Sequence, residues 1–112
     1  MPAAAIIDPA TFAELQRTAG EEFVDELVGT FFEEAPLMLA ELRAALAGGA
    51  ADRFRRAAHS LKTNANTFGA LTLGDMAREL ELGGLPADVR RLDALDAAYA
   101  DAKAALTELT DG

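Results

Sequence analysis

The chain of 112 residues contains one histidine, His59, and no cysteine. A neutral imidazole nitrogen is a competent nucleophile near pH 7, so His59 is the first candidate for covalent chemistry. Lys62 follows one helical turn later, where its ammonium can neutralise negative charge that builds up beside the imidazole. The missing cysteines exclude disulfides, thiolate nucleophiles and Cys-ligated metal sites, which leaves only carboxylate-rich metal sites.

Basic side chains gather around this histidine although the formal net charge of the protein is -9. Residues 50–70 carry four cations against one carboxylate, a local net charge of +3. The cations are Arg53, Arg55, Arg56 and Lys62. Such a patch can hold a phosphoryl group or meet an acidic pocket of a partner, although the same charges can simply solvate a helix face. The negative total predicts repulsion from nucleic acids and anionic membranes, so the expected partners are proteins.

Apolar residues recur at three- and four-residue steps along most of the chain, which is the periodicity of amphipathic helices. Abundant Ala and Leu with few β-branched residues favour helices as well. Glycines separate the periodic segments. The pattern predicts helices over about residues 9–19, 21–47, 51–67, 72–82 and 89–109.

Several residues are typical of helix ends. Asp8 is expected to cap the first helix, and Asp52 is a plausible cap of the third. Thr72 and Asp75 resemble a capping box at the start of the fourth. Pro36 is expected to bend the long second helix without ending it.

Amphipathic helices with short glycine-containing connections predict an all-α fold. The expected architecture is an antiparallel up-and-down four-helix bundle in which the short first helix is a lid over one end. The length suits one domain, residues 1–112, with no room for a second.

On a helical wheel of residues 51–67, the apolar residues Ala58 and Leu61 lie within about 40° of Phe54. His59 lies about 140° away from Phe54, in the middle of a polar stripe. The histidine is therefore predicted to be exposed to solvent.

The segment around His59 closely resembles the signature of the histidine phosphotransfer (HPt) domain of bacterial two-component phosphorelays. The similar residues are Ala58-His59-Ser60-Leu61-Lys62, the run NANTFGA that ends at Ala70, Leu73, and the pair Leu80-Glu81. The expected helix order also resembles that family. The resemblance implies that His59 accepts a phosphoryl group from the aspartyl phosphate of a receiver domain and passes it to the aspartate of another receiver.

The resemblance also implies roles for two neighbours of His59. Lys62 would stabilise the phosphoryl oxygens, and the less favoured alternative is an ordinary surface lysine. Glu81 matches the position whose Gln or Glu, in some family members, hydrogen-bonds the other ring nitrogen and orients the imidazole. The alternative for Glu81 is a solvated carboxylate at a helix end.

Other residues of the segment are candidates for contact with the receiver or for the turn. Arg55, Arg56 and Asn66 are expected at the docking surface or on plain surface. Thr63 stands where many family members have Gly directly after the Lys, so it can change how closely the partner packs. Gly69 is expected to serve the turn between two helices.

The implied partners are receiver domains of response regulators or of hybrid histidine kinases. The divalent metal and most catalytic groups are expected on the receiver, so we expect no cofactor, metal, ATP site or kinase activity in this chain. The N-terminal residues lack a basic region and no apolar run is long enough to span a bilayer, which favours a cytoplasmic protein. No outer helix face carries a heptad seam that would require an oligomer, so we expect a monomer. The alternative is a helical adaptor or scaffold that binds signalling proteins without being phosphorylated. An autonomous hydrolase is poorly supported, because one histidine has no catalytic constellation around it.

Overall fold

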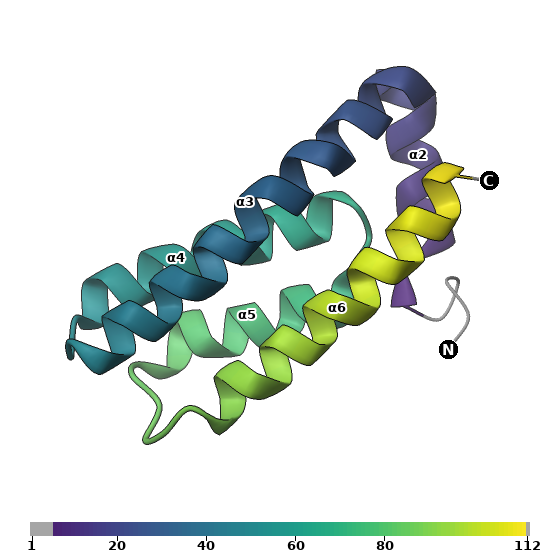
Figure 1. The fold of residues 1–112 in the computed structure, drawn as a ribbon. Coiled ribbons are helices and arrows are strands. Elements are labelled where there is room, and N and C mark those ends of the chain that lie inside the picture. Colours follow the sequence, from purple (N-terminus) through teal and green to yellow (C-terminus); the bar gives the residue numbers. More distant parts are fainter. Residues whose placement is uncertain (1–5, 112) are drawn as a thin grey trace.

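The computed structural model describes residues 6–111, and five α-helices form most of this part of the chain (Figure 1). They are α2 (Pro9–Ala19), α3 (Glu21–Ala47), α4 (Ala51–Thr67), α5 (Leu71–Gly83) and α6 (Arg90–Asp111). Residues 6–111 contain no strand. The predicted all-α class is confirmed, whereas the predicted domain of residues 1–112 also includes residues 1–5 and 112, which lie outside the described residues.

The helices pack on one another in a closed order. α4 contacts both α3 and α5, and α6 contacts the other sides of α3 and α5. Figure 1 shows these four helices extended along the long direction of the molecule, with α2 at the end where α3 begins and α6 finishes. α2 contacts α3 and α4. This order surrounds one hydrophobic core and leaves an outer face of α4 free.

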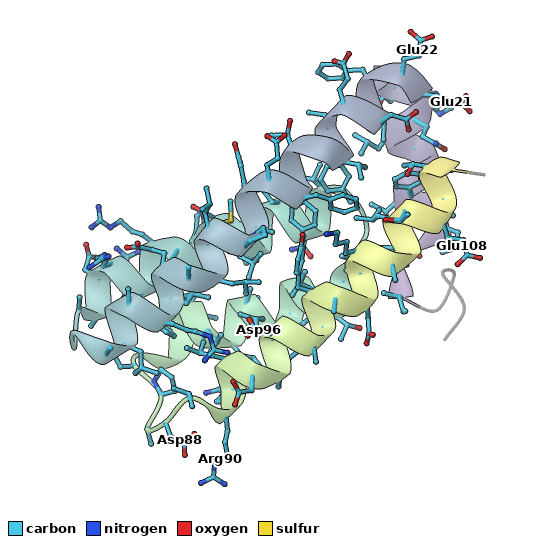
Figure 2. The ribbon with its side chains drawn as sticks, viewed as in Figure 1. Glu21, Glu22, Asp88, Arg90, Asp96 and Glu108 are labelled. Atoms are coloured by element: carbon cyan, nitrogen blue, oxygen red, sulfur yellow. The ribbon has the colours of Figure 1, made fainter. Side chains whose placement is uncertain are left out.

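The core contains apolar side chains from all five helices, and no polar or charged residue among the described ones is fully buried. Its aromatic centre is Phe31 of α3, whose ring contacts those of Phe68 and Tyr99. At the surface, Arg43 of α3 pairs with Asp93 and Asp96 of α6 at 2.8 and 2.5 Å. Asp96 is labelled on α6 in Figure 2. The ion pairs lie between helices that the core already holds together.

The first helix begins as expected and is attached to the turn before α5. The backbone N–H of Thr11 donates to Oδ2 of Asp8 at 3.1 Å, which confirms the predicted cap. The backbone N–H of Asp8 donates to the carbonyl of Gly69 at 2.8 Å. Gly69 has φ of 83°, and a Cβ atom there would lie 2.9 Å from the carbonyl oxygen of Asp8. Glycine is therefore required both by the turn and by the close approach of α2.

Two predicted caps are wrong. α4 begins at Ala51 after Ala50, so Asp52 lies inside its first turn. α5 begins at Leu71, so Thr72 and Asp75 form no capping box. The physical reason lies in the turns before these helices. Each preceding helix ends in a glycine turn that is closed by a backbone hydrogen bond between residues five apart, and the next helix starts directly after it. In the first turn the N–H of Ala50 donates to the carbonyl of the residue at position 45 at 2.8 Å, and a matching bond of 2.9 Å precedes α5.

The predicted helix boundaries otherwise agree with the structure to within about two residues. α3 continues through Pro36 from Glu21 to Ala47. The two ends of the apolar stripe that predicted the last helix, Val89 and Leu109, are exposed. Val89 precedes the first residue of α6, and Leu109 lies in the last turn of α6, beyond the part of the helix that packs on the core.

Candidate functional site

His59 lies near the middle of α4 on the face that points away from the core. Phe54, Ala58, Leu61 and Ala65 on the opposite face are buried, whereas 55% of the His59 side chain is exposed. The helix has this orientation because its apolar residues form a stripe that packs against α3 and α5. The exposure expected from the helical wheel is observed.

Glu81, in the last turn of α5, contacts the imidazole. Its Oε2 atom lies 2.6 Å from Nδ1 of His59, and only 12% of the Glu81 side chain is exposed. An ionised carboxylate can only accept a hydrogen bond, so we assign the proton of the neutral ring to Nδ1. The lone pair then remains on Nε2. The contact thus makes Nε2 the nucleophilic nitrogen.

The same carboxylate also binds Lys62. The Nζ atom of Lys62 lies 2.8 Å from Oε1 of Glu81, and 24% of the lysine side chain is exposed. The pKa of the Glu81 carboxyl lies below its ordinary value, mainly because the Lys62 ammonium stabilises the charged form. Partial burial opposes this effect, and the hydrogen bond with His59 adds to it. Glu81 is therefore ionised at neutral pH and contacts both His59 and Lys62 of α4.

The arginines of α4 also have carboxylate partners. Arg55 and Arg56 contact the two oxygens of Asp52 at 2.6 and 3.3 Å, and the pKa of Asp52 is lowered chiefly by the hydrogen bond from Arg55. Arg53 pairs with Glu41 of α3. The positive charge expected for this segment is therefore balanced in part by carboxylates of neighbouring helices.

The remaining predicted site residues fall into two groups, those near His59 and those in contact with another part of the fold. Thr63 is exposed next to the histidine, and its hydroxyl donates to the carbonyl of His59 at 3.1 Å. Asn66 is exposed as well, but its amide lies over Gly74 of α5. Gly69 lies in the turn between α4 and α5, below the start of α2. Thr63 and the arginines therefore surround the histidine, whereas Asn66 and Gly69 contact other parts of the fold.

A groove beside the histidine helix was missed by the sequence reasoning. It runs between α3 and α4 and has a volume of about 610 Å³. Its lining combines Leu37, Met38, Ala57 and Ser60 with the charged residues Glu41, Arg53 and Arg56. Leu37 is 70% exposed, the largest exposed fraction among the large hydrophobic side chains. The signal in the sequence was the position of Leu37 directly after Pro36, outside the apolar stripe of its helix.

The comparison with protein families agrees with this arrangement. The model of the Hpt domain matches residues 26–105. The chain belongs to the Hpt domain family. The matched part of this Hpt domain includes His59, Lys62 and Glu81. No curated protein and no solved structure matches the chain.

Neither a metal-binding cluster nor a membrane-spanning helix occurs in the part of this Hpt domain that the structure describes. No group of three or more Asp, Glu or His side chains within residues 6–111 is arranged to hold a metal ion. None of the helices in the same residues is long and apolar enough to cross a bilayer.

Replacement of Glu81 by Gln should make the stability of the Hpt domain less sensitive to acid. Because the pKa of Glu81 is depressed in the folded protein, its stabilising contribution is present above its ordinary value of 4.5 and is lost as the pH falls through the lower folded-state value. We expect the difference in melting temperature between the wild-type protein and Glu81→Gln to be constant near neutral pH and to shrink below pH 4.5. Thermal unfolding followed by circular dichroism measures it, and a difference that does not change with pH would contradict the prediction.

Proposed function

We propose that this Hpt domain is a phosphocarrier of a two-component phosphorelay, with His59 as the phosphoacceptor. The observation that carries the proposal is an exposed imidazole whose Nδ1 atom is held by Glu81 at 2.6 Å. The lone pair of Nε2 is then available to a partner. A family match over residues 26–105 supports the same assignment.

The proposed reaction is a phosphoryl exchange between two proteins. Nε2 of His59 attacks the phosphorus of an aspartyl phosphate in a receiver domain. A P–N bond forms, the bond between phosphorus and the aspartate oxygen breaks, and the carboxylate leaves. Nε2 carries no proton in the assigned tautomer, so no proton has to be removed before the attack. The reverse reaction with a second receiver passes the phosphoryl group on.

Lys62 would then change partners during the reaction. Before transfer its ammonium is bound to Glu81 at 2.8 Å. The arriving phosphoryl group places more negative charge within one helical turn of Lys62, so the ammonium can move from the carboxylate to the phosphoryl oxygens. Glu81 would keep its contact with Nδ1 and hold the ring while this happens.

The expected partners are receiver domains of response regulators or hybrid histidine kinases, and the divalent metal of the reaction would belong to the receiver. Arg55, Arg56 and Thr63 surround the histidine where such a domain would approach. Leu37 and Met38 would offer it an apolar contact in the groove between α3 and α4, which charged residues also line. Our proposal includes a cytoplasmic monomer of one domain, residues 1–112. Its α3–α6 would form an antiparallel up-and-down bundle with α2 as a lid.

A transfer assay tests this function. A receiver domain is phosphorylated with a radiolabelled donor, separated from the donor and mixed with the Hpt domain. We expect label on the Hpt domain that is labile in acid and stable in base, which is the behaviour of phosphohistidine, and its passage to a second receiver. Failure of every receiver of the source proteome to transfer label would overturn the proposal.

Leu37→Glu should slow transfer from a receiver by about tenfold or more, because a new charge would have to be buried in the apolar contact. Phosphorylation of His59 by phosphoramidate, a donor too small to need the groove, should keep its rate. The comparison of the two donors measures docking separately from reactivity. Glu34→Gln on the same helix is a suitable control, because Glu34 is exposed and does not line the groove. Equal transfer rates for Leu37→Glu and the wild-type protein would exclude the groove as a docking surface.

A further inference from the structure

Gly74 occupies an unusual place in α5. It lies in the fourth position of a 13-residue helix and is buried. Glycine is unfavourable inside a helix, because it loses more backbone entropy on folding than alanine does. The other glycine in a helix interior, Gly29 of α3, has open space around it, whereas Gly74 does not. A packing reason for the glycine is therefore to be found on the neighbouring helix.

The side chain of Asn66 in α4 fills the space above Gly74. A Cβ atom at position 74 would lie 2.8 Å from Cγ and 3.2 Å from Nδ2 of Asn66, and closer still to its Oδ1. These distances leave no room for a methyl group as long as the Asn66 side chain keeps this position. Asn66 and Gly74 are thus complementary in shape, with the side chain on α4 and the space for it on α5.

The contact between Asn66 and Gly74 lies the same number of residues away from the contact between His59 and Glu81 on both helices. α4 and α5 lie side by side (Figure 1). Asn66 follows His59 by seven residues on α4, and Gly74 precedes Glu81 by seven residues on α5. Seven residues are close to two helical turns, about 10.5 Å, so both contacts lie on the same faces of the two helices. A shift or tilt of α5 at Gly74 is therefore passed directly to Glu81.

We propose that Asn66 and Gly74 are positioning residues that set the distance and register between α4 and α5, and so hold Glu81 against Nδ1 of His59. The inference rests on the proposed function of His59 as the phosphoacceptor. It assigns the exposed side chain of Asn66 to the contact between α4 and α5 instead of the receiver-docking surface. A methyl group at position 74 would have to displace Asn66 or move α5 outward, and the second change lengthens the contact of 2.6 Å between Glu81 and His59.

Four variants test the proposal: Gly74→Ala, Asn66→Ala, the double variant Asn66→Ala/Gly74→Ala, and Gly29→Ala as a control. The control makes the same chemical change in a helix where an added Cβ atom meets nothing within 4 Å. In the double variant, the new methyl group occupies the space that the shortened residue 66 has left. It is therefore expected to restore the spacing that each single change disturbs.

Two measurements that need no partner protein report on the site. Because the chain has one histidine, the imidazole nitrogens give a single set of NMR signals, and their shifts report which nitrogen carries the proton. Phosphoramidate phosphorylates the ring directly, with transfer of its phosphoryl group to Nε2 and release of ammonia. We expect Gly74→Ala to lose the preference for the Nδ1–H tautomer and to react about tenfold more slowly. Asn66→Ala should show a smaller loss, and the double variant should return to within about twofold of the wild-type rate.

The outcomes separate this inference from the proposed function. If Gly74→Ala keeps the wild-type tautomer and rate, Asn66 simply moves into solvent and the inference is overturned. If Gly74→Ala does not fold, Asn66→Ala is compared with the double variant. A return of the tautomer preference and the reaction rate in the double variant supports the inference, and no return refutes it. If the tautomer responds as expected but no receiver transfers label to the wild-type protein, the proposed function fails and the positioning role stands. Loss of receiver transfer alone in Asn66→Ala would assign Asn66 to docking instead.

Discussion

Replacement of His59 by Gln should abolish the acid-labile, base-stable label that the Hpt domain acquires from a phosphorylated receiver. The amide of Gln has a similar size and polarity, but its nitrogen has no available lone pair and forms no stable phosphoramidate. Since His59 is the only histidine, no second imidazole can take its place. We expect a loss of at least about 10³-fold, down to the background of the assay.

The same variant separates a phosphocarrier from a scaffold. The His59 side chain is 55% exposed and lies outside the core, so His59→Gln should fold and lose at most the small stabilisation that its contact with Glu81 contributes. Binding to the receiver should persist, because the docking surface is intact. Label that survives in His59→Gln would contradict the assignment of the phosphoacceptor. A wild-type protein that binds receivers but never acquires label would favour the scaffold.

Phe31→Ala should cause the largest loss of stability. Phe31 is 2% exposed, and its ring lies 5.3 Å from that of Phe68 and 5.7 Å from that of Tyr99, measured between centroids. It thereby joins α3 to α6 and to the end of α4. Removal of a buried phenyl ring costs about 3–5 kcal/mol, a large part of the 5–15 kcal/mol that is typical for the free energy of unfolding of a whole domain. Urea denaturation at neutral pH measures this loss.

Tyr99→Phe is the matched control for that experiment. It keeps the ring whose edge contacts Phe31 and removes a buried hydroxyl that has no hydrogen-bond partner among the described residues. An unpaired buried hydroxyl is unfavourable, so Tyr99→Phe should be at least as stable as the wild-type protein. A loss for Phe31→Ala below about 1 kcal/mol would show that the aromatic cluster is not the centre of the core.

The local sequence was sufficient to predict the helices, and the structure shows why two of the predicted caps were wrong. The apolar spacing around Phe54 and Leu61 predicted α4 and the exposure of His59, because the directions of side chains around a helix follow a fixed period. The starts of α4 and α5 depend instead on the glycine turns before them. Asp52 has the residue type of a cap, but the chain already enters the helix at Ala51. Cap preferences of single residues do not include the geometry of the preceding turn.

The helical periodicity of α4 predicted the part of the candidate site that lies on this helix. Only the family resemblance pointed to Glu81. His59 and Lys62 are one turn apart in the sequence, whereas Glu81 is 22 residues away from His59 and meets it only after α5 folds back. Its contact with both side chains is a result of tertiary packing. The role of Asn66 was hidden for the same reason, because its counterpart is an absent side chain at Gly74.

The carboxylates paired with the cations of α4 have a consequence for how partners find this protein. Because carboxylates match most of these positive charges, this surface exerts a weaker attraction over long distances, and salt screens what remains within about 8–10 Å. This face of α4 therefore adds little electrostatic steering, and encounters there depend mainly on diffusion and orientation. Selection between partners is left to contacts at short range, where an arriving molecule must break an existing ion pair before it forms its own.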